Sequence, residues 1–127
     1  MGLRMRIDGE RILGAVHFDR RQEGAPGFAH GGAVATVLED ALGTVLLMVG
    51  RPAVIDNLSI GYRAPALLDR DLTIEAWCDR IDGRELQLAA RLLDGGLVIA
   101  EARGLFIEVD LDNSAGAGSR RPRRGND

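Results

Sequence analysis

The sequence predicts an α+β domain in which one antiparallel sheet wraps around a single long central helix. Three observations support this fold class. Residues 33–49 lack proline and are rich in alanine, leucine and valine, which favours a helix of about five turns. The segments after residue 52 show period-two alternation of apolar and polar side chains. Short turns containing Asp-Gly join these segments, and such turns connect antiparallel strands.

The first element is predicted to be a β-hairpin. Residues 3–8 and 11–19 flank Gly9-Glu10, and the pair Asp8-Gly9 is typical of tight hairpin turns. A loop follows and extends through Gly32. Pro26 fixes one backbone angle of this loop, and its glycines permit tight turns and close backbone approach.

The predicted helix, residues 33–49, is apolar on almost every face and ends near Gly50. A helix of that kind is normally buried on all sides. Because one sheet cannot cover it completely, we expect a partner subunit to cover the rest. Two adjacent carboxylates, Glu39 and Asp40, interrupt the apolar sequence. They point about 100° apart, so they cannot share one environment.

Four further strands are predicted after the helix. They cover residues 53–63, 68–80, 84–93 and 97–109, with turns at Asp82-Gly83 and at residues 94–96. In the first of these strands, strict alternation places Val54, Asp56, Leu58, Ile60 and Tyr62 on one face and Ile55, Asn57, Ser59 and Gly61 on the other. A sheet with one apolar face needs a cover, and the helix is the candidate.

The length of 127 residues suits one domain, which we predict to span residues 1–109. Residues 110–127 lack apolar periodicity, so we predict a disordered Arg/Gly-rich tail. The net charge of −3 argues against nucleic acid as a partner. A single cysteine, no apolar secretory signal and no uninterrupted run of about 18 apolar residues favour a cytoplasmic protein without a membrane span.

Four segments together carry a resemblance to a known family. They are residues 27–32 (Gly-Phe-Ala-His-Gly-Gly), followed by a helix with Glu39 nine residues after His30, and then residues 57–65, 82–84 and 100–106. Over about residues 10–109 the chain resembles the hot-dog-fold acyl-CoA thioesterases. The branch it resembles contains the phenylacetate-pathway and human mitochondrial acyl-CoA thioesterases. The resemblance therefore implies the hot-dog fold and hydrolysis of an acyl-CoA thioester.

The resemblance also implies roles for individual residues. The backbone N–H of Gly31 would polarise the thioester carbonyl, and Glu39 would act as nucleophile or as general base toward water. We expect substrate contacts from His30, Gly32, Asp56, Asn57 and Arg63. The proposed reaction needs no cofactor, since coenzyme A is part of the substrate. No metal is expected, because two histidines and one cysteine make a poor ligand set.

Elementary chemistry supports the same residues independently. A helix N-terminus offers unpaired N–H groups and the positive end of the helix dipole to a developing oxyanion. Gly31 and Glu39 are eight residues apart, or about 12 Å along one helix. They cannot flank one thioester within a single chain, so the hypothesis requires a homodimer, or a dimer of such dimers, with the site at an interface. Asp40 is expected to be structural and to pair with an arginine.

The sequence departs from the family pattern in two places, which keeps two other functions open. Gly24 stands where some relatives have asparagine or glutamine, although Gln22 lies nearby. Ile55 stands where some relatives have a hydroxyl residue. A non-catalytic acyl-CoA-binding protein is therefore one alternative. An acyl-thioester hydratase or dehydratase is the other, and it would need His30 to move protons, whereas we expect His30 to shape the loop and the helix start by hydrogen bonding.

Overall fold

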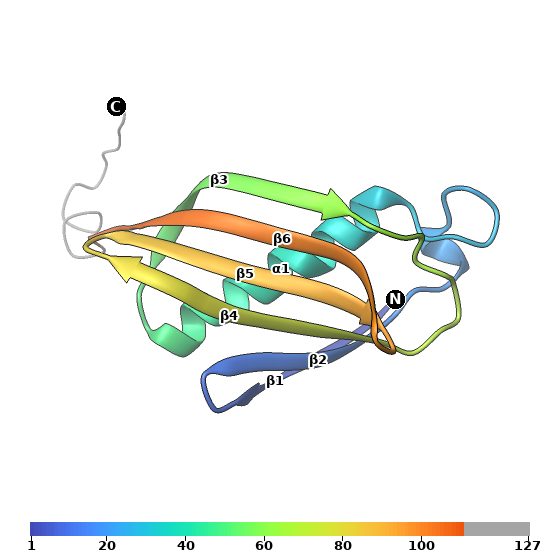
Figure 1. The fold of residues 1–127 in the computed structure, drawn as a ribbon, viewed down its shortest axis with the longest axis horizontal. Helices are drawn as coiled ribbons and strands as arrows, with labels where there is room; N and C mark the ends of the chain where they lie inside the picture. Colours follow the sequence, from blue (N-terminus) through green and yellow to red (C-terminus); the bar gives the residue numbers. More distant parts are fainter. Residues whose placement is uncertain (111–127) are drawn as a thin grey trace.

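The computed structural model describes residues 1–110 and contains one helix packed on one sheet (Figure 1). The elements in chain order are β1 (Gly2–Asp8), β2 (Arg11–His17), the 3-10 turn η1 (Arg20–Gln22), α1 (Gly31–Val49), β3 (Ala53–Tyr62), β4 (Leu72–Asp82), β5 (Glu85–Asp94) and β6 (Leu97–Glu108). The six strands form a single antiparallel sheet with the order β1-β2-β4-β5-β6-β3. This architecture confirms the predicted α+β fold and its order of elements.

The core lies between one face of α1 and the sheet strands β4 and β5, which α1 crosses. The helix contributes Val37, Leu38, Ala41, Leu42 and Val45, none of which exposes any surface. These residues recur at spacings of three and four, which places them on one side of a helix. The facing strands contribute alternate apolar residues such as Ile74, Leu88 and Leu92. The apolar packing between these two layers drives folding.

The opposite side of α1 is open in the single chain, as expected for a helix that one sheet cannot cover completely. The open helix face is exposed at Gly32, Thr36, Glu39, Asp40, Gly43 and Leu47. Leu47 exposes 82% of its surface. The reason is geometric, because one sheet covers one side of a helix. By length and composition alone, Gly31–Val49 would also qualify as a membrane span, although its inner face is the core of this domain.

Strand β3 lies at one edge of the sheet, and a β-bulge changes its predicted alternation. The register with β6 shifts between Ile55 and Asn57, so Asp56 is the extra residue. Ile55 therefore lies opposite Phe106, on the face that carries α1. Asn57 lies opposite Leu105, on the other face. The predicted faces of Val54 and Ile55 were wrong because the bulge exchanges them.

Two other boundaries differ from the predictions. The helix begins at Gly31, two residues earlier than predicted, because His30 already caps it. Strand β4 begins at Leu72, because Asp69 has φ 57° and interrupts the extended backbone. The segment before β4 instead holds the glycine loop, through hydrogen bonds from the N–H of Ala29 to the carbonyl of Ala66 (2.8 Å) and from the N–H of Leu68 to the carbonyl of Gly27 (3.1 Å).

The predicted hairpin turns are confirmed, with φ near +60° at Gly9, Gly83 and Gly95. The predicted disordered tail, residues 110–127, lies outside the described residues except for Asp110.

Candidate active site

The glycine loop that leads into α1 is held in place from its first residue. Asp19 caps η1 and forms a capping box with Gln22, whose side-chain oxygen accepts a hydrogen bond of 3.0 Å from the N–H of Asp19. Later in the loop, the N–H of Gly27 donates to a carboxylate oxygen of Glu23 at 2.7 Å. Gly27 has φ 86°, a conformation that glycine adopts without strain. The loop therefore delivers the chain to the helix in one defined shape.

His30 is the N-cap of α1. Its Nδ1 accepts a hydrogen bond of 3.0 Å from the N–H of Ala33, and its carbonyl accepts from the N–H of Ala33 (3.1 Å) and of Val34 (3.4 Å). Its own N–H donates to the carbonyl of Gln22 at 2.8 Å. Because Nδ1 is the acceptor, the proton of the neutral imidazole lies on Nε2. The expected structural role of His30 at the helix start is confirmed.

The capping by His30 leaves two backbone donors open. An α-helix begins with four N–H groups that lack helical acceptors. Here they are those of His30, Gly31, Gly32 and Ala33. The N–H of His30 donates to the carbonyl of Gln22 and that of Ala33 to Nδ1 of His30, while Val34 makes the first regular helix bond, to the carbonyl of His30. Within residues 1–110, the N–H groups of Gly31 and Gly32 have no hydrogen-bond acceptor. They form the open donor pair at the positive end of the helix dipole, an arrangement that can bind an anionic oxygen.

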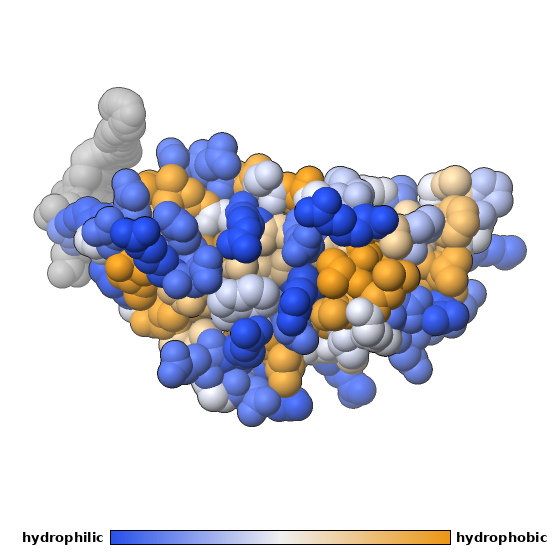
Figure 2. Space-filling view, in the orientation of Figure 1, coloured by the Kyte–Doolittle hydropathy of each residue, from blue (hydrophilic) through white to orange (hydrophobic). Residues whose placement is uncertain are grey.

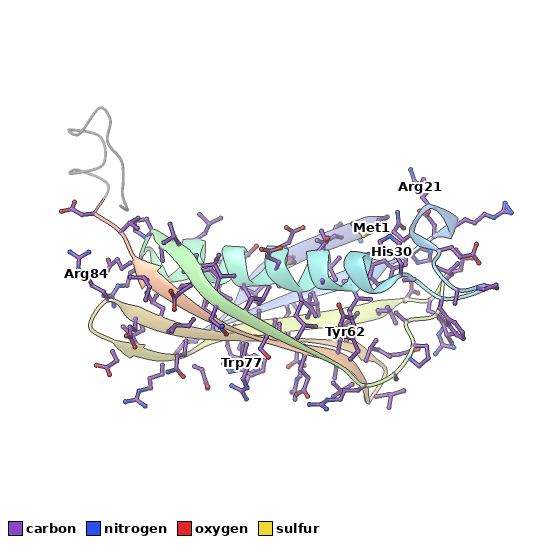
Figure 3. All side chains as sticks on the ribbon, turned by 90° about the horizontal axis from the view of Figure 1, so that it is seen from above. Met1, Arg21, His30, Tyr62, Trp77 and Arg84 are labelled. Atoms are coloured by element: carbon purple, nitrogen blue, oxygen red, sulfur yellow. The ribbon has the colours of Figure 1, made fainter. Side chains whose placement is uncertain are left out.

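Tyr62 is a residue near this pair whose role sequence reasoning missed. Its hydroxyl donates a hydrogen bond of 3.0 Å to the carbonyl of Gly31. Figure 3 shows Tyr62 between the end of β3 and the start of α1, near the end of the helix at which His30 lies. Its alternation in β3 predicted the correct face but not this contact, because the two residues are 31 positions apart in the chain.

Glu39 and Asp40 both lie on the open helix face, two turns beyond the donor pair. Neither carboxylate forms an ion pair with another residue in the part of the chain that the structure describes. The expectation that Asp40 pairs with an arginine was therefore wrong for the single chain, because no arginine of the sheet reaches the open face. Both carboxylates are available to a partner.

The structure does not bring the other expected contact residues to this place within one chain. Asn57 lines a hollow of about 170 Å³ beside Gln87, on the sheet face away from α1. Arg63 pairs with Glu101 at 2.9 Å on that same face. Asp56 is exposed at the β-bulge. One chain thus groups His30, Gly31 and Gly32, with Glu39 farther along the same helix.

The two departures from the family pattern have physical reasons here. A Cβ on Gly24 would lie 2.8 Å from the Cβ of His30, so the close packing of the loop on His30 requires glycine. Gln22 does not take over the role of the asparagine or glutamine that some relatives have at the position of Gly24, since its side-chain oxygen accepts a hydrogen bond from the N–H of Asp19. Ile55 faces α1 opposite Phe106 and offers no hydroxyl there.

The sheet face away from α1 carries charged side chains between apolar patches and is hollowed (Figure 2). It carries hollows of about 570 Å³, beside Arg4 and Leu13, and about 420 Å³, beside Trp77. The guanidinium of Arg11 lies 4.5 Å from the centre of the Trp77 ring, and Glu75 accepts hydrogen bonds from Arg11 and Arg91. These charges satisfy one another, so the face contributes nothing to the donor pair.

Two further observations concern groups that could hold or react with a ligand. Among residues 1–110, no group of three histidine, cysteine, aspartate or glutamate side chains could hold a metal ion. Burial raises the pKa of the Cys78 thiol above its usual value, and Cys78 lies at the β-bulge of β4. Its sulfur is therefore a weak nucleophile at neutral pH.

The part of the chain that forms this site also matches the model of a known protein family. A model of the thioesterase superfamily matches residues 26–100, which include the end of the glycine loop, α1 and strands β3 to β5. The chain belongs to the thioesterase superfamily, and its sheet and helix are the hot-dog fold of that superfamily.

Individual relatives agree with this assignment. The acyl-coenzyme A thioesterase THEM4 of Bos taurus is 36% identical over 95 residues, which are 73% of this chain and 39% of that protein. This chain thus spans about two fifths of the length of the curated relatives it matches. A crystal structure of a thioesterase superfamily protein is 29% identical, with a TM-score of 0.76, covering 78% of this chain and 49% of the other.

A more distant structure has the same fold. The hypothetical thioesterase of Streptococcus pneumoniae, crystallised with coenzyme A, is 19% identical with a TM-score of 0.79 and covers 85% of this chain and 89% of that one.

Proposed function

We propose that the chain is an acyl-CoA thioesterase that hydrolyses an acyl-CoA to a carboxylic acid and free coenzyme A. The observation that carries the proposal is the open donor pair of Gly31 and Gly32 at the start of a helix whose exposed face also carries Glu39. Open N–H groups suit a developing oxyanion, and an unpaired carboxylate suits attack on a carbonyl or activation of water. The names of the acyl-coenzyme A thioesterase relatives support the substrate class.

The chemistry assigns one role to each group. The thioester oxygen accepts hydrogen bonds from the donor pair, with Gly31 as the principal donor, so negative charge on that oxygen is stabilised as the carbonyl is attacked. The carboxylate of Glu39 either attacks the carbonyl carbon, giving an anhydride that water then opens, or removes a proton from the attacking water. In both routes the carbon–sulfur bond breaks, and coenzyme A leaves as the thiolate and takes up a proton.

The active form in this proposal is a homodimer, or a dimer of such dimers. Gly31 and Glu39 are about 12 Å apart along α1, so the donors of one chain must meet Glu39 of another. Strand β3 supports such pairing, because it is an edge strand with open backbone groups. Its side chains Val54 and Ile55 expose 55% and 43% of their surface. A partner would bury these apolar side chains together with Leu47 of α1.

Thiol release from short, medium, long and aryl acyl-CoAs tests the proposal. Wild type is expected to hydrolyse at least one class, and Glu39→Gln is expected to lower kcat by at least about a thousandfold because the amide is neither nucleophile nor base. Asp40→Asn is the matched control, since it neutralises the adjacent carboxylate on the same open face and should keep most of the activity. A blank without substrate corrects for Cys78.

The two departures at Gly24 and Ile55 favour one second candidate, a protein that binds acyl-CoA without hydrolysing it. Neither position offers a polar group that could hold water beside the carboxylate. Binding of acyl-CoA by wild type, with no thiol released from any member of the panel, would support this candidate and contradict the thioesterase.

A further inference from the structure

Tyr62, the last residue of β3, contacts the first residue of α1. It pairs across the sheet with Ala100, which is fully buried, so Tyr62 lies on the sheet face that carries α1. Its hydroxyl donates a hydrogen bond of 3.0 Å to the carbonyl of Gly31. Within the described residues, this is the one hydrogen bond between β3 and α1. The edge strand and the open donor pair are therefore joined through a single hydroxyl.

The tyrosine ring lies beside Gly31, close enough that a side chain there would touch it. A Cβ built on Gly31 would lie 3.6 Å from two ring atoms, which is van der Waals distance. The end of β3 is fixed separately, because the N–H groups of Arg63 and Ala64 donate to the carbonyl of Ile99 at 2.8 and 3.1 Å. Tyr62 still exposes 54% of its surface. Removing only the hydroxyl should therefore leave the fold and the ring in place.

The hydroxyl acts on the donor pair through one peptide group. The carbonyl of Gly31 and the N–H of Gly32 belong to the same peptide. A hydrogen bond accepted by that carbonyl withdraws electron density from the nitrogen, and linked hydrogen bonds strengthen one another by about 10–30%. The same bond fixes the plane of this peptide between two glycines, which are the residues with the greatest backbone freedom.

We infer that Tyr62 is a positioning residue that orients and polarises the Gly31–Gly32 peptide toward the thioester oxygen. The inference rests on the proposed function, in which that oxygen becomes negatively charged. A stronger and fixed donor stabilises the charged transition state more than the neutral substrate, so the effect falls on kcat rather than on substrate binding. Tyr62 touches Gly31 and not the reacting atoms.

The test compares Tyr62→Phe with Ser59→Ala. Both variants remove one hydroxyl from β3, but Ser59 lies opposite Arg103, on the other face of the sheet. Tyr62→Phe is expected to lower kcat about tenfold, less than the loss of a direct oxyanion donor, with KM and Tm unchanged. In NMR spectra of the protein without substrate, the amide proton of Gly32 is expected to move upfield in Tyr62→Phe and to stay in place in Ser59→Ala.

The outcomes separate this inference from the proposed function. Wild-type kcat in Tyr62→Phe, or a parallel loss of Tm and substrate binding, would overturn the positioning role while leaving the thioesterase intact. If wild type hydrolyses no acyl-CoA, the proposed function fails, and the positioning role toward a thioester oxygen fails with it, whatever the Gly32 amide shows. An unmoved Gly32 amide would overturn the polarisation of this peptide even if kcat fell.

Discussion

The two ends of α1 differ in how their backbone polar groups are satisfied. At the C-terminal end, Gly50 adopts φ 71° and its N–H donates to the carbonyl of Leu46 at 3.0 Å. Arg51 follows directly, and its guanidinium donates to the carboxylate of Glu108 at 2.6 Å and to the carbonyl of Gly83 at 2.9 Å. At this closed end, the helix is terminated by a backbone hydrogen bond, and the chain that follows is held to the sheet by the Arg51 side chain.

At the N-terminal end, the cap leaves two backbone N–H groups without an acceptor among the described residues. Of the first four N–H groups, that of His30 donates to the carbonyl of Gln22 and that of Ala33 to Nδ1 of His30, and the groups of Gly31 and Gly32 stay open. The comparison separates two roles for a helix end: the satisfied C-terminal end supports stability, and the open N-terminal end is the one that the proposal assigns to catalysis. Changes at the closed end should lower stability without changing catalysis, and changes at the open end should do the reverse.

Among the changes at the two ends of α1, the largest expected effect comes from Gly31→Pro. Proline is well tolerated at the first position of a helix and removes the N–H that the proposal assigns to the oxyanion. His30, with φ −71° and ψ 154°, already has the extended conformation required before proline. We expect kcat to fall about 10²- to 10³-fold with Tm unchanged. Steady-state thiol release and thermal unfolding measure the two quantities.

Gly31→Ala is the control for that variant, since it keeps the N–H and places its Cβ at an ordinary 3.5 Å from the Tyr62 hydroxyl. It should retain most of the activity. Equal losses in Gly31→Pro and Gly31→Ala would mean that the shape of the loop, and not the donor, limits the rate.

A smaller effect of the opposite kind is expected from Gly50→Ala. The added Cβ meets no atom within 4 Å, so the cost is the positive φ alone. That conformation costs alanine about 1 kcal/mol, which corresponds to a fall in Tm of about 4 °C. Thiol release should be unchanged. A variant with normal Tm and reduced kcat would contradict the division between the two ends.

The smallest effect concerns the Arg51–Glu108 pair and its dependence on pH. The Arg51 guanidinium holds the pKa of Glu108 below its usual value. A lowered pKa means that the pair stabilises the fold above about pH 4.5 and that this contribution is lost as pH falls through the lowered pKa. Glu108→Gln should therefore lower Tm slightly at pH 6, and the difference from wild type should shrink as the pH is lowered further below 4.5. A difference that is constant with pH would show that the carboxylate charge is not involved.

The parts of this molecule that the sequence predicted are those set by local patterns. The helix, its glycine cap and the hairpin turns follow from spacing and turn chemistry between neighbouring residues. The bulge at Asp56 was not predictable in this way, since it arises where β3 pairs with β6, about 50 residues later. Strict alternation therefore misplaced Val54 and Ile55.

The candidate site divides in the same way. The capping role of His30 follows from its place directly before the helix, and it was predicted. The contact between Tyr62 and Gly31 depends on where the edge strand ends in space, and no local pattern indicates it. Asn57 and Arg63 were expected beside substrate, but in one chain they lie on the far face of the sheet, so that expectation stays a prediction for an assembled dimer.

The central claim is that the donor pair of one chain works with Glu39 of another, and mixing two inactive variants tests it most directly. Gly31→Pro and Glu39→Gln are each expected to be nearly inactive. After the two are unfolded together and refolded at equal concentrations, half of the dimers should combine one chain of each kind. Each mixed dimer then contains one site with both groups intact, so the mixture should regain about a quarter of the wild-type activity. A mixture that forms mixed dimers and stays inactive would contradict a site shared between chains.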